Sequence, residues 1–394
     1  MATHRFRNEP MRPKVLILHH FMPQWRLDFF EGLHATLEQA GAELNVMYGR
    51  LHNENATKRD EVSLPWGIFR DNRVLHTRSG DFVWQRAMDL AWNHDLVIVN
   101  QHNRLIVNHV LMALRPLHRY KLGLWGHGLN LQDRVDSAGN RMKRALMRRC
   151  DWWFAYTEGV KRTVAGSGFP EERITVVQNA IDTATLAGAY QALPREAGSK
   201  VRQELGIGNG PVGIYCGGMY PEKRIPFLIE ASTALKHREP GFHLIVVGDG
   251  PDGRIVRSFA ADHPWVHPVG PMFGSARVPF FAAADVFLMP GLVGLAVLDS
   301  FALETPMITT TYPYHSPEIE YLVDGENGLI TPNDLGSYVD RVASLLASPH
   351  ELAVLREGCR AAYPRYSLDE MIRRFAGGIT AALRMVPGQK GPAL

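Results

Sequence analysis

Two glycine-containing turns in the second half of the chain combine residue types that can bind phosphate. In the first, Gly217 and Gly218 follow an apolar segment and lead to Lys223 and Arg224, where a helix is expected to begin. Glycines let the backbone approach a ligand closely, and the start of a helix favours an anion. The two bases would then neutralise a diphosphate. Taken alone, the segment fits a strand–helix turn with two solvated bases equally well.

The second turn, residues 290–296, also lies between an apolar segment and a predicted helix. The helix is expected to begin near Leu295 or Ala296, and the free N–H groups at such a start could hold phosphate oxygens. Asp299 lies about one turn further on, where a carboxylate can accept the two hydroxyls of a ribose. The alternative for Asp299 is a first-turn acid favoured by the helix dipole.

A histidine stands out in the first half. The apolar segment 121–125 ends in Gly126-His127-Gly128. A side chain held between two glycines at the carboxyl end of a buried strand is expected to point into a ligand cleft rather than into a core. The alternative is chance, because most of the 17 histidines lie in this half.

The loop after the first predicted strand is bulky, aromatic and polar. It contains His20, Trp25 and Arg26, which we interpret as candidates for binding an acceptor. The alternative is packing of the loop against its own domain.

Residues 141–149 place bases around a short apolar strip in a predicted helix. Basic amphipathic helices can lie on anionic membranes. This helix is therefore a candidate for peripheral membrane contact, and the alternative is a surface helix that packs Leu146 inward.

The elements that must position these residues form two successive α/β series. Short apolar strands separated by helices are typical of parallel sheets covered on both faces. The first series has strands at 15–18, 44–48, 96–99, 121–125, 152–156 and 174–177, with a helix at 27–39. The second has strands at 212–216, 244–247, 266–269, 286–289, 307–309 and 328–330, with helices near 226–237, 276–283, 297–304 and 335–346.

We therefore predict two doubly wound, Rossmann-like domains that face each other across a cleft. Residues 183–200 are polar and contain Pro194, which favours a linker. The predicted boundaries are 1–183 for an acceptor-side domain and 184–366 for a donor domain. The helical segment within 367–394 has no strand after it and is expected to cross back to the first domain.

Bulk composition excludes several other classes of protein. The 394 residues are 45% hydrophobic and 21% charged, as in a globular protein of two domains. Three cysteines without metal-ligand spacing make neither a disulfide framework nor a zinc site. No apolar run approaches the ~18 residues of a membrane span, and no secretory signal precedes the first strand, so we expect a cytoplasmic location. The net charge of +3 comes with no nucleic-acid-binding motif, so no nucleic-acid partner is expected.

Several segments occur together in an order that resembles the family-4 retaining glycosyltransferases. These are residues 280–290 (FFAAADVFLMP), Asp299–Ala302 with Pro306, Pro317–Ile319 and 324–329 (DGENGL). The order is maintained over 212–331 and is looser in the first half. The turn at 290–295 resembles a Pro-Gly-x-Val-Gly-Leu variant found in a subset of bacterial polysaccharide-type transferases.

The resemblance implies the GT-B fold and transfer of a sugar from a nucleotide diphosphate, with retention at the anomeric carbon and without a metal. No other cofactor is implied. His127 would hydrogen-bond a sugar hydroxyl, and the base would lie against the loop at Pro271 and Met272. The implied donor site consists of Gly217, Gly218, Lys223, Arg224, Gly248, Pro271, Met272, Gly291, Gly294, Leu295, Ala296 and Asp299.

The chain departs from the family pattern at three positions. Gly218 stands where an arginine is usual, and the family's paired glutamates align with Gly291 and Asp299. Asp299 can replace a glutamate with a shorter reach. Gly291 cannot, so we expect altered donor contacts.

The sequence thus predicts a retaining, metal-independent glycosyltransferase with a glycan, lipid-linked or small-molecule acceptor. A catalytically silent sugar-nucleotide binder and a GT-B sugar-nucleotide epimerase are the alternatives.

Overall fold

The protein divides into two compact units. The computed structural model describes residues 12–50, 61–78, 80–129 and 137–385. Of the described residues, those up to Gln178 and those from Met371 onward form the first unit. Residues Asn179–Glu370 form the second. Each unit is an α/β structure, as predicted, and each is described by itself.

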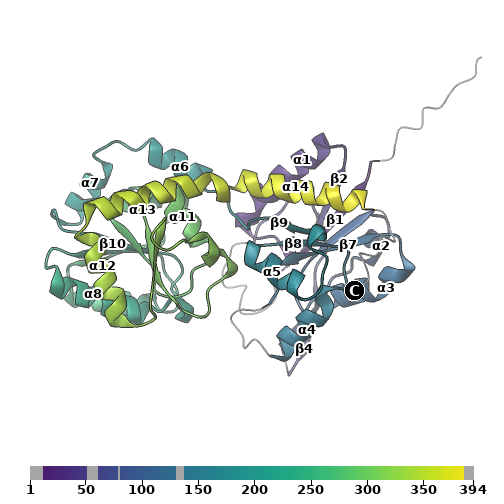
Figure 1. Cartoon of the computed structure of the whole chain (residues 1–394), viewed down its shortest axis with the longest axis horizontal. Coiled ribbons are helices and arrows are strands. Elements are labelled where there is room, and N and C mark those ends of the chain that lie inside the picture. Colours follow the sequence, from purple (N-terminus) through teal and green to yellow (C-terminus); the bar gives the residue numbers. More distant parts are fainter. Residues whose placement is uncertain (1–11, 51–60, 79, 130–136, 386–394) are drawn as a thin grey trace, which may run out of the picture. The chain divides into compact units, whose positions relative to one another are not determined.

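The first unit is built on a seven-stranded parallel sheet with the order β3-β2-β1-β6-β7-β8-β9 (Figure 1). The order reverses between β1 and β6, which makes the carboxyl ends of these two strands the switch point where ligands bind in such sheets. The strands are β1 Lys14–Phe21, β2 Glu43–Gly49, β3 Ile68–Phe69, β6 Leu96–Asn100, β7 Lys121–Gly126, β8 Trp152–Ala155 and β9 Ile174–Val176.

The helices of this unit alternate with the strands along the chain. They are α1 Leu27–Gln39, α2 Met88–Ala91, α3 Ile106–Leu114, α4 Ala138–Met147 and α5 Glu158–Gly166, together with α14 Leu368–Arg384 from Met371 onward. Among the described residues, no helix combines the length and the apolar character needed to cross a membrane.

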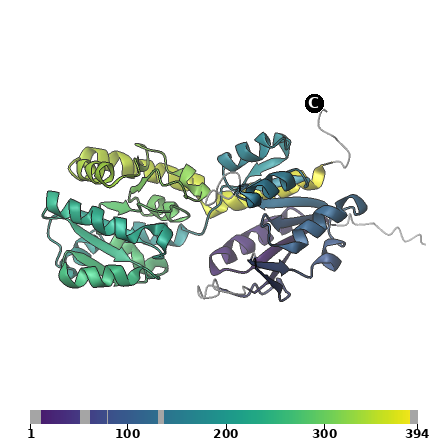
Figure 2. The same cartoon turned by 90° about the horizontal axis from the view of Figure 1, so that it is seen from below.

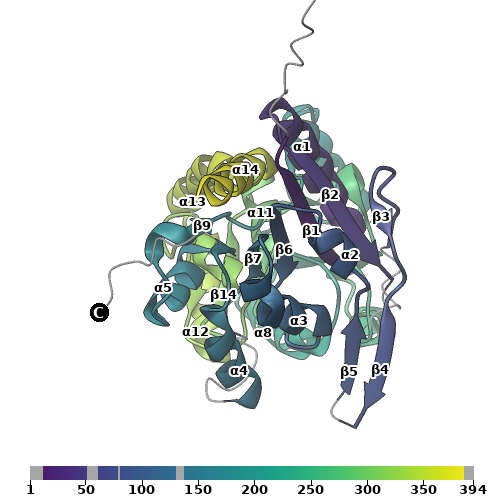
Figure 3. The same cartoon turned by 90° about the vertical axis from the view of Figure 1, so that its right-hand side faces the viewer.

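An antiparallel hairpin that the sequence analysis missed extends beyond this sheet (Figure 3). It pairs β4 Arg73–Thr77 with β5 Gly80–Trp84. Four of the five residues of β4 are exposed. A search for fully apolar parallel strands does not detect such a segment, because solvated strands carry polar side chains.

The second unit has a six-stranded parallel sheet with the order β12-β11-β10-β13-β14-β15. Its switch point lies between β10 and β13, and Figure 2 shows helices on both faces of the sheet. Its strands are β10 Val212–Cys216, β11 His243–Val247, β12 Val266–Gly270, β13 Val286–Leu288, β14 Met307–Thr310 and β15 Gly328–Thr331. Its main helices are α8 Ile225–Arg238, α9 Gly253–Asp262, α10 Val278–Ala282, α11 Ala296–Ala302, α12 Leu335–Leu346 and α13 Pro349–Ala362.

The predicted linker at 183–200 is wrong. This stretch forms α6 Ala184–Gln191 and the first half of α7 Ala197–Glu204, with Pro194 between the two helices. Leu186 and Val201 are buried, because α6 and α7 pack against α10 and α11. Polar composition concealed these helices, since only one or two apolar side chains of each reach the core.

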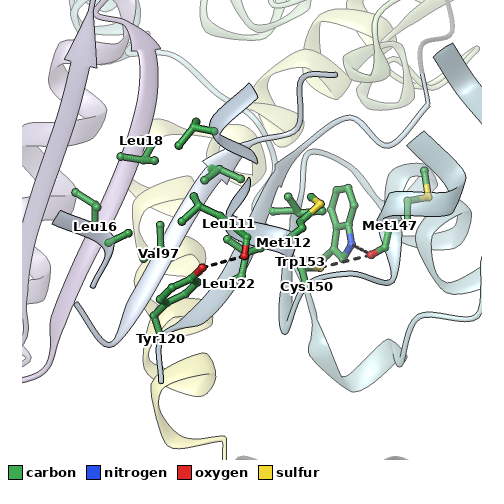
Figure 4. Packing of buried hydrophobic residues seen from close by; sticks show 14 of the residues in the cluster. Leu16, Leu18, Val97, Leu111, Met112, Tyr120, Leu122, Met147, Cys150 and Trp153 are labelled. Atoms are coloured by element: carbon green, nitrogen blue, oxygen red, sulfur yellow. Dashed lines mark hydrogen bonds between the residues drawn. The ribbon is translucent and has the colours of Figure 1, made fainter. Parts of the chain in front are cut away.

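The core of the first unit lies between its sheet and the helices. On one face, alternate residues of β1, β6, β7 and β8 pack against α3, α4 and α5 (Figure 4). Two buried polar groups in this cluster are satisfied. The Tyr120 hydroxyl donates to the carbonyl of Leu111 at 2.9 Å, and the Trp153 indole N–H donates to the carbonyl of Met147 at 2.9 Å.

On the opposite face, α14 packs on β7, β8 and α1. The Phe375 ring is fully buried and stacks on Phe154 with ring centroids 4.4 Å apart. Phe29 and Trp125 contact it edge-on at 5.3 and 5.0 Å. The close fit requires small residues, since a Cβ at Gly378 would lie 2.6 Å from the hydroxyl of Thr175.

We expect Phe375→Ala to destabilise the first unit by about 3–5 kcal/mol, because it removes a buried aromatic side chain and leaves a cavity. Thermal melting followed by tryptophan fluorescence measures this, since Trp125 contacts the lost ring. Leu117→Ala is the control, because Leu117 is 77% exposed in the same unit. Equal melting temperatures for the two variants would contradict the packing described.

Candidate functional site

Glycines bring two loops of the second unit together at the carboxyl ends of β10 and β11. A Cβ at Gly248 would lie only 2.0 Å from the carbonyl oxygen of Gly217, so a larger residue does not fit there. The Gly217 N–H donates to the carbonyl of Val247, and the Met219 N–H donates to that of Asp249, both at 3.0 Å. The first glycine turn is therefore a fixed backbone surface.

The Tyr220 ring lies beside one departure from the family pattern. A Cβ at Gly218 would lie 2.5 Å from its ring, which occupies the space that a side chain at position 218 would need. Gly218 is held in place by its own carbonyl, which accepts from the Tyr215 hydroxyl at 2.8 Å.

A close backbone approach also joins the first glycine turn, after β10, to the turn at 290–296. A Cβ at Gly291 would lie 2.4 to 2.6 Å from backbone atoms of Glu222 and Lys223. The Leu292 N–H donates to the carbonyl of Glu222 at 2.9 Å. Glycine at 291 is therefore required by the backbone of the neighbouring turn, and no glutamate fits there unless the two turns separate.

The two cations of the first turn have different surroundings. The Lys223 ammonium donates to the carbonyl of Leu292 at 2.6 Å, and burial lowers its pKa to about 8. Arg224 has a left-handed backbone, with φ of 57°, and donates to Asn333 at 2.6 Å and to the carbonyl of Pro290 at 3.2 Å. Its guanidinium also lies over the Phe227 ring at 4.2 Å. Arg224 thus links the first turn to the loops that contain Pro290 and Asn333, whereas the Lys223 side chain points into the 290–296 turn.

Backbone amides of the second turn are available to a ligand. Among the described residues, none accepts a hydrogen bond from the N–H of Gly294, Leu295 or Ala296. The turn is held from behind by His315 and Ser316, which the sequence analysis did not single out. His315 Nδ1 accepts from the Val293 N–H at 2.9 Å, and the Ser316 N–H donates to the Val293 carbonyl at 2.9 Å.

Two hydrogen bonds define the tautomer of the His315 ring. Its Nδ1 accepts, and its Nε2 donates to the carbonyl of Thr310 at 2.8 Å. Burial lowers its pKa, so the ring is neutral. No spacing signal in 312–316 identifies this role, because the contact depends on how β14 and the turn meet.

Asp299 is buried one turn into α11 and is paired with a basic side chain. Its Oδ1 accepts from Arg277 at 3.0 Å, and its side chain is only 6% exposed. Arg277 follows the loop after β12, which holds the predicted base contacts Pro271 and Met272. Pro271 is exposed and Met272 partly exposed, and the neighbouring Phe273 is 82% exposed. Sequence analysis found Asp299 and missed Arg277.

In the first unit, His127 follows β7 and is partly buried. Gly126 is required before it, because a Cβ there would lie 2.7 Å from Cβ of Gln101, and Gly128 after it has φ of 71°. Burial, followed by the charge of Lys143, lowers the pKa of His127 to about 4. The ring is therefore neutral near pH 7. Its Nδ1 lies 3.3 Å from the carbonyl of Leu129 and donates to it, which leaves Nε2 as a hydrogen-bond acceptor.

Two more histidines lie at the switch point of this sheet. The rings of His20, in β1, and His102, after β6, have centroids 6.3 Å apart. The pKa of His102 is lowered to about 4 by burial and then by surrounding basic groups, so it too is neutral. Its Nδ1 accepts from the Arg104 N–H at 3.3 Å, which leaves its Nε2 to donate. His102 was not predicted, because no glycine or motif marks it.

The other two predicted acceptor residues, Trp25 and Arg26, differ in their exposure. Trp25 is 41% exposed, whereas Arg26 is only 1% exposed. The Arg26 guanidinium lies over the rings of Trp25 and Trp125, at 4.5 and 5.0 Å, and donates to the sulfur of Met371 at 3.6 Å. Arg26 thus stabilises the packing of the first unit, and its burial argues against the predicted contact with an acceptor.

The basic segment 141–149 lies on and just after α4. Met147 and Lys143 face inward, and Leu146 is partly buried. Arg141, Met142, Arg148 and Arg149 are exposed. The exposed side of this segment is therefore mostly basic. Elsewhere, no cluster of three or more His, Cys, Asp or Glu in the described residues is arranged to hold a metal ion.

Comparison with known proteins relates both units to glycosyltransferases. Residues 210–348 match the family model described as glycosyl transferases group 1, and residues 29–185 match glycosyltransferase family 4. A GDP-mannose-dependent α-(1-6)-phosphatidylinositol monomannoside mannosyltransferase of Mycolicibacterium smegmatis is 28% identical over 202 residues, which is 48% of this chain and 51% of that protein. The corresponding dimannoside mannosyltransferase of Mycobacterium tuberculosis is 25% identical over 62% of this chain and 68% of its own length. The chain thus spans about half the length of the first of these relatives.

Solved structures share the fold. Anabaena HepE in complex with UDP is similar with a TM-score of 0.68 and 17% identity, over 93% of this chain and 100% of that one. WaaG, a glycosyltransferase involved in lipopolysaccharide biosynthesis, is similar with a TM-score of 0.59 and 17% identity, over 93% and 99%. The chain therefore has the GT-B fold, which confirms the fold that the sequence resemblance implied.

We expect Gly291→Ala to destabilise the second unit by about 1–3 kcal/mol, because the new methyl group overlaps backbone that cannot rotate away. Differential scanning calorimetry measures the change. Gly188→Ala is the matched control, since Gly188 lies in α6 with nothing within 4 Å of a new Cβ. A Gly291→Ala protein as stable as the control would show that the two turns are not locked together.

Proposed function

We propose that this chain, which has the GT-B fold and matches the group 1 and family 4 glycosyltransferases, transfers a sugar from a nucleotide-diphosphate donor with retention and without a metal. The acceptor is a glycan, a lipid-linked or a small-molecule hydroxyl compound. One observation carries the proposal: the cationic Lys223, three amides without acceptors in the 290–296 turn, and Asp299 lie together at the carboxyl edge of one sheet. That edge presents groups for a diphosphate and a ribose.

Named relatives are consistent with this chemistry. The solved HepE structures hold UDP, and one holds UDP-glucose. The mycobacterial relatives are named for GDP-mannose and for phosphatidylinositol mannoside acceptors. Since these donors differ in base, the relatives support a nucleotide-diphosphate sugar as the class of donor, and the base and the sugar stay open.

Charge at the leaving group is the main catalytic requirement in such a transfer. When the bond between the sugar and the diphosphate breaks, negative charge builds on the leaving diphosphate. Lys223 and the amides of Gly294–Ala296 would stabilise it, and fixed donors do so without reorganising. In our proposal the leaving phosphate accepts the proton of the acceptor hydroxyl on the same face, so no protein base is needed.

His127 would position substrate rather than remove a proton. Its neutral ring presents Nε2 as an acceptor, which suits a sugar hydroxyl that donates. The exposed basic side of 141–149 would contact an anionic membrane if the acceptor is lipid-linked.

A silent sugar-nucleotide binder is the second candidate, and Gly291 is the observation that favours it. The resemblance implies a glutamate that contacts the donor sugar at this place, and the packing of Glu222 and Lys223 excludes a side chain here. Binding of nucleotide without transfer to any acceptor distinguishes the binder from the transferase.

Binding and turnover of UDP-, GDP-, ADP- and dTDP-sugars in EDTA test the proposal. We expect one nucleotide series to bind, and transfer to proceed without added metal. Lys223→Ala should weaken binding of the nucleoside diphosphate by ~1.5–3 kcal/mol, the range for a charged hydrogen bond.

The pH dependence of diphosphate binding provides a second test of the role of Lys223. Lys223 in the free protein loses its charge as the pH rises through about 8, so affinity for the diphosphate should fall above pH 8 in the wild type and not in Lys223→Ala. Lys236→Ala, at the other end of α8, is the control. Unchanged affinity in Lys223→Ala, or activity that EDTA abolishes and magnesium restores, would contradict the proposal.

We expect His127→Ala to lower kcat by about tenfold or more, which corresponds to ~1.4 kcal/mol or more of lost transition-state stabilisation. Affinity for the nucleoside diphosphate should stay at the wild-type value. Because its pKa is about 4, His127 stays neutral between pH 5 and 8 and contributes no pH dependence there, and its role is lost as the pH falls through 4.

His118→Ala is the control, since His118 precedes the opposite end of the same strand. Melting temperature and kcat are measured on one preparation. A destabilised but fully active His127→Ala enzyme would assign the residue to packing instead.

A further inference from the structure

Among the described residues, Asp299 of the second unit has one cationic partner, and the two form a mostly buried pair. Arg277 donates from one terminal nitrogen to Asp299 Oδ1 at 3.0 Å. The side chains are 21% and 6% exposed. Arg277 lies between β12 and α10, whereas Asp299 lies in α11, so the pair joins the segment after β12 to the helix after β13.

The two oxygens of Asp299 are not equivalent. Oδ1 accepts from Arg277, whereas Oδ2 has no hydrogen-bond partner among the described residues. A carboxylate whose first oxygen is fixed presents the second in one direction. This arrangement suits a hydroxyl donor that arrives from outside the protein.

Arg277 also has a guanidinium nitrogen without a hydrogen-bond acceptor among the described residues. Its Nε is buried and has no acceptor among the described residues. Its other neighbour is Cys216 at the end of β10, where burial raises the thiol pKa to about 12 so that no second negative charge is present. Asp299 is therefore the anion that holds this guanidinium.

Electrostatics explain why the carboxylate needs this partner. Burial raises the pKa of Asp299, and the Arg277 charge opposes that rise. Within the described part of the chain, the titratable groups that face Asp299 from the packed elements are Arg277 and the neutral Cys216. Without the guanidinium, the carboxyl would take up a proton at a higher pH, and the protonated group accepts hydroxyl hydrogen bonds less well.

We propose that Arg277 is a positioning residue of the donor site, which fixes Asp299 through Oδ1 and leaves Oδ2 to accept a ribose hydroxyl of the nucleotide. This inference rests on the proposed function. It assigns a role to a residue that no motif marks, and it makes ribose binding a property of a charged pair rather than of one acid.

A purely structural ion pair predicts something different. A buried pair often contributes little net stability, and losing one partner mainly leaves an uncompensated charge. Such a pair would change the melting temperature upon mutation. It would leave the pH dependence of nucleotide binding as it is in the wild type.

Calorimetry with UDP, GDP and ADP between pH 5.5 and 8 tests the proposal on Arg277→Met, Arg277→Lys and Asp299→Asn. The ratio of variant to wild-type Kd is compared at each pH, because the ratio cancels the titration of the nucleotide itself. We expect Arg277→Met to bind about tenfold or more weakly at pH 6, with the ratio falling toward pH 8 as Asp299 ionises. Arg277→Lys should restore affinity to within about threefold, because it returns the charge.

Two further comparisons separate positioning from general damage. In the Asp299→Asn background, Arg277→Met should weaken binding by less than about twofold, since the group it positions is gone. Arg341→Met is the matched control, because Arg341 pairs with Glu351 between α12 and α13 of the same unit and should leave Kd unchanged. Arg277→Gln replaces the Met variant by the same criteria if the latter does not melt cooperatively.

The outcomes are distinct. If the wild type binds a nucleotide and Arg277→Met binds it equally well, or loses the same factor at every pH and in the Asp299→Asn background, the positioning role is wrong and the proposed function stands. If the wild type binds none of the three nucleotides and does not bind dTDP either, the proposed donor site is wrong, and the inference built on it is overturned as well.

Discussion

The contact between two backbones at Gly291 determines the layout of the candidate donor site. Because a Cβ at this position would lie within 2.6 Å of Glu222 and Lys223, the turn after β13 and the turn after β10 lie directly against each other. The Leu292 N–H closes this contact on the Glu222 carbonyl. The ammonium of Lys223 is thereby held beside the 290–296 turn, whose amides have no acceptors of their own among the described residues.

That constraint also accounts for a missing side chain. A family position usually filled by glutamate is glycine here because the backbone of a neighbouring turn occupies the space. Gly218 differs, since the group beside it is the Tyr220 side chain, which is 38% exposed, and not backbone. The departure at Gly291 is thus a property of how the two turns pack, and it leaves the cationic and amide groups of the edge in place.

Burial sets the charge state of the groups around both switch points. In the first unit it keeps His102 and His127 neutral, so one presents a donor and the other an acceptor without either carrying charge. In the second unit burial opposes ionisation of Asp299 and weakens the hold of Lys223 on its proton. Arg277 offsets the first effect, so the acid depends on a partner that lies 22 residues away in the chain.

The sequence by itself determined the two α/β series, because short apolar strands between helices repeat with a spacing that local chemistry controls. The strand β10 and the helices α1 and α12 were predicted with the bounds that the structure has. The glycine turns and His127 could likewise be found, since they sit beside apolar strands. The linker at 183–200 was wrong and the hairpin β4–β5 was missed, because their identity depends on a few buried side chains rather than on a periodic pattern. Only the tertiary structure decided that Arg26 is buried, that His315 holds the 290–296 turn and that Arg277 pairs with Asp299. Each of these depends on elements brought together across the sheet, and spacing along a chain carries no information about which side chains such packing brings into contact.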